Sequence, residues 1–274
     1  MNKKRNIFFI IIAFIVSTFF AIILTNYYIN KKQKELLNSI YESTHKNIFE
    51  KTQNLINDKQ NTSLAIAISL SKDETLYTHL KNRDFEKLNY VKIAKLIETN
   101  SKYKNIWIQI FDSNLNSVYR SWTNIRGSLN FRPDLKKIEA LKNISTSISA
   151  GLFNIGIRAR TPIFDENNNF YGALEVVTHF DSITEDLVKN NISPVVIGDK
   201  SIRKNLTNPL LSKLFIDDYY IANENIDMNL YNYIKENGVE KYINIDKFII
   251  ENGYLISKYP LFDENKKNLA YIIN

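Results

Sequence analysis

The 274-residue sequence contains no cysteine. It therefore forms no disulfide, no thiolate metal site and no cysteine nucleophile. Its three histidines, His45, His79 and His179, do not form the His-x-x-x-His pair found in many zinc sites. The sequence also lacks a glycine-rich phosphate loop and a nucleophile elbow. We therefore expect no metal, no cofactor and no enzymatic activity in this chain.

The charge balance does not indicate a nucleic-acid-binding protein. There are 36 Lys and Arg residues against 29 Asp and Glu residues, which gives a formal net charge of +7. A nucleic-acid partner requires basic residues gathered on one face, whereas here they are scattered among acidic ones. We expect no nucleic-acid partner.

One long apolar run lies near the N-terminus. Residues 7–24 carry no charge, and the run reaches about 20 residues, enough to cross a bilayer core, when it is extended to Ile29. A cleaved signal peptide is the alternative, because Lys3, Lys4 and Arg5 precede the run. Signal peptides, however, have a shorter apolar core that ends in small residues. Residues 1–30 are therefore predicted to be a cytoplasmic tip and a transmembrane helix.

The orientation of this helix is not decided by the charges on its two sides. Lys31, Lys32 and Lys34 nearly balance the positive charges at the N-terminal end, so the positive-inside rule gives no clear answer. The rest of the chain is a large polar region, and such domains translocate regardless of a few charges. We expect a single-pass protein of the cell inner membrane with its bulk in the periplasm.

A long helix is predicted after the membrane segment. Residues 31–71 contain no Gly or Pro, and apolar residues recur with a helical period: Leu37, Tyr41, Ile48, Leu55 and Ile66. A helix of this length exposes an apolar stripe unless something covers it. We expect a homodimer through Lys31 to about Asn61, with Ile40 and Phe49 at the interface.

A repeated pattern indicates two modules. The stretch "RTPIFDENNNFYGALEVV" at 160–177 has a degraded copy, "YPLFDENKKNLAYII", at 259–273. The offset between Pro162 and Pro260 is 260 − 162 = 98 residues, the size of a small domain. Around these stretches lie alternating strands, a hairpin at "IFDSNLNSVY" and short helices. The predicted fold is α+β, with a long helix and two antiparallel-sheet modules.

These motifs resemble the extracytoplasmic double Cache sensor, also called the PDC sensor. The likeness covers about residues 31–274 and implies a PAS-like membrane-distal module at 31–190 and a smaller membrane-proximal module at 191–274. Sensors of this kind occur at the N-termini of diguanylate cyclases, histidine kinases and chemoreceptors. The resemblance implies a small-molecule sensing region of a receptor for signal transduction. Its output domain is absent from this chain, and we expect a truncation before a second transmembrane helix.

The resemblance also implies where a ligand binds. Family members hold it between the sheet and a lid formed by the loop and helix after the first hairpin. In amino-acid-binding members an Arg-x-Trp-Tyr motif grips the carboxylate, and a later aspartate holds the ammonium. Here Arg132 is retained, Asp134 stands at the tryptophan position, and Val177 stands at the aspartate position. A buried ammonium would lack a counter-charge, which argues against an ordinary amino acid.

An organic anion is the predicted ligand. Arginines bind carboxylates bidentately and stack on aromatic rings, and the predicted contacts are Arg132, Arg120, Trp122 and Arg158. Asp134 is the candidate contact if the pocket has reversed its polarity. Two alternatives remain. In the first, Arg120 and Arg158 are exposed strand residues and Trp122 contributes only to packing. In the second, the chain is a membrane-anchored structural or protein-interaction module that binds no ligand.

Overall fold

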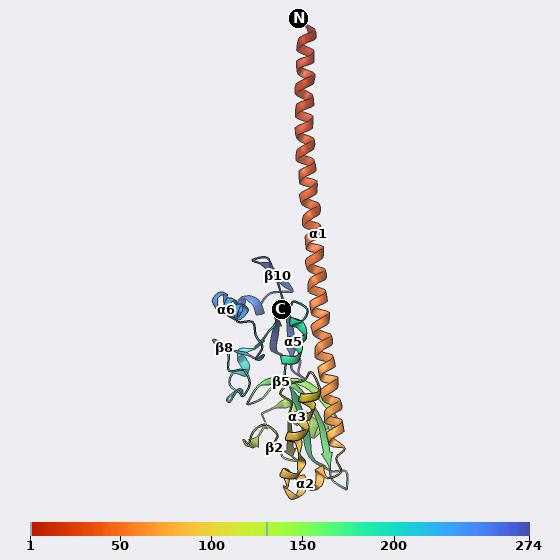
Figure 1. The fold of residues 1–274 in the computed structure, drawn as a ribbon, viewed down its shortest axis with the longest axis vertical. Helices are drawn as coiled ribbons and strands as arrows, with labels where there is room; N and C mark the ends of the chain where they lie inside the picture. Colours follow the sequence, from red (N-terminus) through yellow and green to blue (C-terminus); the bar gives the residue numbers. More distant parts are fainter. Residues whose placement is uncertain (1, 130) are drawn as a thin grey trace. The chain divides into compact units, whose positions relative to one another are not determined.

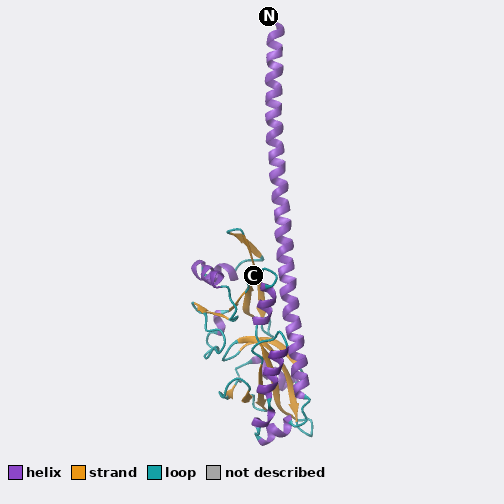
Figure 2. Ribbon diagram, in the orientation of Figure 1, coloured by secondary structure: helices purple, strands orange, loops and turns teal. Residues whose placement is uncertain are grey.

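The computed structural model describes residues 2–129 and 131–274. Its internal contacts divide the chain into residues 1–47 and residues 48–274, which are described separately. Helix α1, Asn2–Ser71, runs through both. The other elements, all in the second unit, are α-helices, two short 3₁₀ helices and strands arranged in two sheets (Figure 1, Figure 2).

The first unit consists of the N-terminal part of α1. By length and composition this helix can cross a membrane: its most apolar 18-residue window has a mean hydropathy of 3.1. Beyond that stretch, Leu36, Leu37 and Ile40 remain 62%, 47% and 49% exposed. An apolar stripe therefore continues past the segment that can lie in a bilayer.

The first sheet has six antiparallel strands in the order β3-β2-β1-β6-β5-β4. The strands are β1 (Trp107–Asp112), β2 (Asn116–Arg120), β3 (Gly127–Ser128), β4 (Ser145–Ala150), β5 (Ile155–Phe164) and β6 (Phe170–Thr178). Helices α2 (Leu76–Asn82), η1 (Phe85–Leu88) and α3 (Tyr90–Asn100) precede the sheet, α4 (Pro133–Leu141) lies between β3 and β4, and α5 (Asp181–Val188) follows it.

The second sheet has the order β10-β11-β12-β7-β9-β8. Its strands are β7 (Val195–Gly198), β8 (Phe215–Ile216), β9 (Tyr219–Ile221), β10 (Phe248–Glu251), β11 (Tyr254–Phe262) and β12 (Asn268–Ile273). The helices of this part are η2 (Lys200–Ile202), α6 (Met228–Asn237) and α7 (Val239–Ile243). The predicted α+β fold, a long helix followed by two antiparallel sheets, is confirmed.

The sequence repeat corresponds to the same place in both sheets. Pro162 lies on β5 opposite Ala173, and Pro260 lies on β11 opposite Tyr271. Each strand is followed by the same turn, in which an aspartate side chain accepts two backbone N–H groups at 2.8–2.9 Å: Asp165 in the first sheet and Asp263 in the second. The two turns need the same residue types, which explains why the sequence similarity between the two sheets is visible at this stretch rather than in the core.

One face of the first sheet packs on α1 and α3 through an aliphatic core. Ile108, Ile110, Leu174 and Val176 are fully buried there. Gly172 permits the close approach of β6 to β1, because a Cβ at this position would collide with the carbonyl oxygen of Phe111. The opposite face of the sheet is covered by α4, and it carries the charged residues described below.

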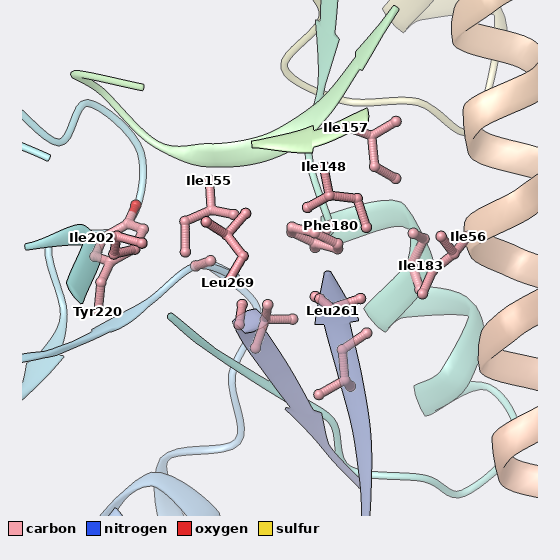
Figure 3. Close-up of a cluster of buried hydrophobic side chains, with 14 of the residues drawn as sticks. Ile56, Ile148, Ile155, Ile157, Phe180, Ile183, Ile202, Tyr220, Leu261 and Leu269 are labelled. Carbon is pink, nitrogen blue, oxygen red and sulfur yellow. The ribbon is translucent and has the colours of Figure 1, made fainter. Parts of the chain in front are cut away.

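A second core joins the two sheets and the C-terminal part of α1. Ile148, Ile155 and Ile157 of the first sheet face Leu261 and Leu269 of the second part (Figure 3). The same figure shows Ile56 of α1 beside Ile183 of α5. The remaining face of the second sheet packs on α6 and α7 around Tyr231, Ile234 and Tyr242. Apolar contacts thus connect both sheets and the C-terminal part of α1 within residues 48–274.

Candidate functional site

A row of polar side chains crosses four strands of the first sheet. Arg120 on β2 pairs with Gln109 on β1, Gln109 pairs with Glu175 on β6, and Glu175 pairs with Arg160 on β5. Side chains of directly opposed residues project from the same face of a sheet, and residues two apart in a strand share a face. Arg158 therefore lies on this face as well, in the next row, opposite Val177.

Helix α4 places two more charged groups over this row. Arg132 precedes Pro133, which is the first residue of the helix and has the fixed φ that helix starts favour. The Arg132 guanidinium donates to both oxygens of Asp134 at 3.1 and 2.7 Å and to both oxygens of Glu175 at 3.0 and 2.5 Å. Arg132 therefore joins the start of α4 to the sheet.

Arg160 makes the second connection between the same two acids. Its Nε donates to Glu175 at 2.7 Å, and its Nη2 donates to Asp134 and, at 2.7 Å, to the Ser147 hydroxyl. Arg132, Arg160, Asp134 and Glu175 thus form a closed set of two cations and two anions. Charge-assisted bonds of this kind are short and strong.

Arg158 and Arg120 lie outside this closed set. Arg158 has one carboxylate partner, Glu175 at 3.1 Å, and it also donates to the Asn154 side-chain oxygen at 3.0 Å. Arg120 donates to the Gln109 side-chain oxygen at 3.0 Å and to the Ile125 carbonyl. Within the part of the chain that the structure describes, none of the Arg120 hydrogen bonds goes to a carboxylate.

All of these charges are buried. The four arginines are at most 3% exposed and the two acids at most 2%. The described cluster therefore holds four positive charges against two negative charges, a surplus of two. Buried charge without a counter-ion is costly, so this site is suited to a negatively charged ligand.

The pKa shifts follow the same division. Burial raises the pKa of Glu175, but Arg132, Arg158 and Arg160 outweigh it and lower that pKa to about 2. Arg132 and Arg160 likewise hold the pKa of Asp134 well below its usual range against the effect of burial. Burial instead lowers the pKa of Arg120 and of Arg158 to about 10 in each case. Asp134 and Glu175 instead raise the pKa of Arg132 against the effect of burial, so the charges of Arg120 and Arg158 are less stabilised than that of Arg132.

Aromatic rings border Arg120. Trp107 stacks on Trp122 with ring centroids 4.5 Å apart, and Phe153 meets Trp122 edge-on at 6.0 Å. The guanidinium carbon of Arg120 lies 5.2 Å from the centre of the Phe153 ring, within cation–π range. Val177 packs in the same cluster as Trp107 and Phe153. The result is an apolar wall beside a positively charged edge.

Two hydrogen-bond donors here are buried without a partner among the residues described. They are the indole N–H of Trp122 and the side-chain NH₂ of Asn154, a residue only 2% exposed. Neither group can accept a hydrogen bond. Together with the guanidinium groups of Arg120 and Arg158, these two groups are hydrogen-bond donors. A ligand that binds beside them would need acceptor oxygens.

A cavity of about 240 Å³ adjoins the other side of the cluster. It is lined by Arg132, Asp134 and Ser149, together with side chains of both charges from the second part of the chain: Lys204, Lys267, Asp263 and Glu264. The Ser149 hydroxyl is buried and has no partner among the described residues. No group of three potential metal-binding side chains occurs within 2–129 and 131–274.

The structure brings all five predicted site residues to one region. The alternative in which Arg120 and Arg158 are exposed is wrong, because each is only 3% exposed. Its other part, Trp122 in packing, agrees with the stacking of Trp122 on Trp107. Asp134, which was predicted as a ligand contact only for a reversed polarity, is the partner of Arg132 and Arg160. Arg132 does point inward, but the carboxylates it contacts belong to the protein.

Sequence reasoning missed Gln109, Arg160 and Glu175. A signal for the two charged residues was present: "IRARTP" places two arginines two positions apart, and "ALEVV" places one glutamate, within otherwise largely apolar strands. A charged residue in a run that is buried on both faces must have a partner. What the sequence did not provide was the register that makes these residues neighbours.

Comparison with known proteins gives structural neighbours only. No family model and no curated protein matches the chain. The sensor domain of the V. cholerae histidine kinase DctB is 14% identical and has a TM-score of 0.47, with 84% of this chain and 95% of that chain covered. The ligand-binding domain of the Campylobacter jejuni chemoreceptor Tlp3 in complex with 4-methylisoleucine is 16% identical, with a TM-score of 0.43 and coverages of 85% and 90%. The E. coli DcuS sensor domain is 18% identical, with a TM-score of 0.40 and coverages of 51% and 98%. These neighbours are sensor domains rather than catalytic domains, and the likeness concerns the fold.

Proposed function

We propose that this chain is the extracytoplasmic sensing region of a bacterial membrane receptor and that it binds a small organic anion at the arginine cluster of the first module. The observation that carries the proposal is the charge surplus: four buried arginines face two buried carboxylates. An anion would supply the missing negative charge. The chain's own residues, and not its structural neighbours, support this choice of ligand.

The binding edge in this proposal runs from Arg120 and Trp122 to Arg158 and Asn154. These residues offer guanidinium groups with the fewest carboxylate contacts and two donors without partners in the described part of the chain. Val177 and Phe153 give the ligand an apolar surface. An α-ammonium group on the ligand would lie among arginines and is therefore disfavoured.

The membrane arrangement is part of the proposal. The transmembrane segment within residues 1–30 anchors the chain in the inner membrane, with residues 31–190 and 191–274 as two Cache-like modules in the periplasm. An apolar helix of spanning length and the polar character of the rest of the chain support this arrangement.

Ligand binding is tested with the full chain in lipid nanodiscs by thermal shift. The panel contains mono- and dicarboxylates, inorganic phosphate and a quaternary amine. We expect stabilisation by anions, about 2.7 kcal/mol when the anion is present at 100 times its Kd, and none by the amine. If no anion raises the melting temperature, or if the amine does, the anion-sensing proposal fails. In the first case the buried ion network serves packing only, as in a module without a ligand.

We also propose a homodimer through the exposed stripe of α1. Replacement of Leu37 and Ile40 by Asn should lower the dimer fraction in analytical ultracentrifugation. The two side chains are exposed apolar surface that a dimer would bury, and Asn removes that gain. Phe49 does not fit the predicted interface in the same way, because its ring lies 4.6 Å from that of Tyr259 within the same chain. Phe49→Asn is therefore the control: it should reduce stability more than dimer content. An unchanged dimer fraction in the Leu37/Ile40 double variant contradicts this interface.

A further inference from the structure

The buried face of α1 contains a lysine. Five residues of α1, spaced three or four apart, form its buried face and are at most 4% exposed: Thr52, Ile56, Lys59, Ser63 and Ala67. Lys59 is the charged member of this set, and it is only 2% exposed. Lysine is almost never fully buried unless it is paired, so its surroundings require an explanation.

The Lys59 ammonium has an incomplete set of partners. Its Nζ donates to the Ser182 hydroxyl at 2.6 Å and lies 3.9 Å from the centre of the Tyr103 ring. An ammonium has three N–H donors, yet in the described part of the chain no ion pair joins it to a carboxylate. One carboxylate oxygen nearby is also without a partner there: Oδ2 of Asp181, which is buried.

Other charged groups face Lys59 from several elements. From α5 these are Asp181, Glu185 and Asp186, and from the loop before β1 it is Lys102, which pairs with Asp186 at 2.8 Å. Asp58 of α1 is exposed, and Glu224 of the second part donates its backbone N–H to Asp181 at 2.7 Å. At the end of β6, burial lowers the pKa of His179 to about 3, so this group stays neutral.

Burial dominates the balance at Lys59. It lowers the pKa of Lys59 from 10.5 to about 7, although Asp181 opposes the shift. The shift reduces the proton affinity by roughly 3,000-fold relative to an exposed lysine.

The segment that contacts Lys59 also borders the arginine site. Val177 lies opposite Arg158 and Trp107 in the sheet, and the Thr178 hydroxyl meets that of Ser63 on α1 at 2.8 Å. His179 lies edge-on to Trp107 at 4.5 Å. Residues 177–182 thus lie between the candidate ligand site and α1, the helix that leads toward the membrane.

We propose that Lys59 is a reversible proton-binding site between α1 and α5, through which this protein responds to pH as a second input beside its ligand. With the proton bound, a poorly paired ammonium lies in the α1–α5 contact and weakens it. Without the proton, the neutral amine keeps its bond to Ser182 at little cost. The Lys59 site depends on the contacts of its ammonium with Ser182 and Tyr103 and does not require the ligand proposal to hold.

The proton site is tested by NMR of the full chain in nanodiscs with isotope-labelled lysine side chains. We expect one lysine signal to titrate near pH 7, to be absent in Lys59→Met and to persist in the control Lys213→Met, which changes an exposed lysine. Asp181→Asn should move the midpoint to lower pH, because Asp181 favours the charged form. If every lysine signal of the wild-type chain titrates above pH 9, there is no such site.

The link to α1 is tested by hydrogen exchange. After correction for intrinsic rates, we expect residues 56–63 of the wild-type chain to be less protected at pH 6 than at pH 8.5, and we expect no such difference in Lys59→Met. Stability should follow the same sign: the folded state binds fewer protons between pH 7 and 10.5, so the free energy of unfolding of the wild type rises over that range relative to Lys59→Met. Equal protection at both pH values in the wild type would show that the proton does not act on α1.

Discussion

Replacement of Glu175 by Gln should reduce the free energy of unfolding by about 3–5 kcal/mol, the usual cost of breaking a buried ion network from one side. The Glu175 carboxylate accepts from Arg132, Arg158 and Arg160 and from the side chain of Gln109. Glutamine has nearly the same shape but no charge, so the described cluster would hold four positive charges against one. Chemical denaturation of the full chain measures the loss.

The same prediction has a pH dependence. The pKa of Glu175 falls from 4.5 to about 2 on folding, so its contribution is fully present above pH 4.5 and is lost as the pH falls toward 2. The stability difference between wild type and Glu175→Gln should therefore shrink in that window. Glu166→Gln, which changes an exposed turn residue, is the matched control and should change stability little. A Glu175→Gln chain as stable as the wild type at pH 7 would show that the network is not the structural centre of this module.

The elements with local signals were predictable from the sequence. The apolar run before Ile29 and the absence of Gly and Pro through residue 71 correctly predicted a long helix. Asn252-Gly253, a pair that favours tight hairpin turns, joins β10 to β11, and both residues have positive φ, 50° and 81°. The aspartate turns made the repeat visible because their side-chain hydrogen bonds are formed within five residues.

The cluster was not predictable in the same way, because its residues meet only through strand register and through the position of α4. Arg132 and Glu175 are 43 positions apart in the sequence, and the residues around each one do not predict their contact. The sequence alone indicated arginines that suit an anion. It did not show that Asp134 and Glu175 already neutralise part of the positive charge of these arginines. Because Arg132 is paired with both acids, we now expect the ligand to contact Arg120 and Arg158 instead.

This redistribution gives the sharpest test of the anion proposal. Arg120→Met should weaken binding of the carboxylate that gives the largest thermal shift by roughly 10- to 100-fold, the equivalent of one lost hydrogen-bonded contact to a charged group. It should cost no more than about 1 kcal/mol in folding stability, because Arg120 has no carboxylate partner in the described part of the chain and burial already disfavours its charge.

Arg132→Met should behave in the opposite way and lose several kcal/mol of stability, since Arg132 joins Asp134 to Glu175. Arg126→Met is the control, because Arg126 is an exposed arginine between β2 and β3 whose hydrogen bonds among the described residues go to backbone carbonyls; it should change affinity far less than Arg120→Met. Isothermal titration calorimetry and denaturation of the three variants separate binding from folding. If Arg120→Met unfolds the chain, or binds the carboxylate as tightly as the wild type, then the surplus charge is structural and the anion lies elsewhere.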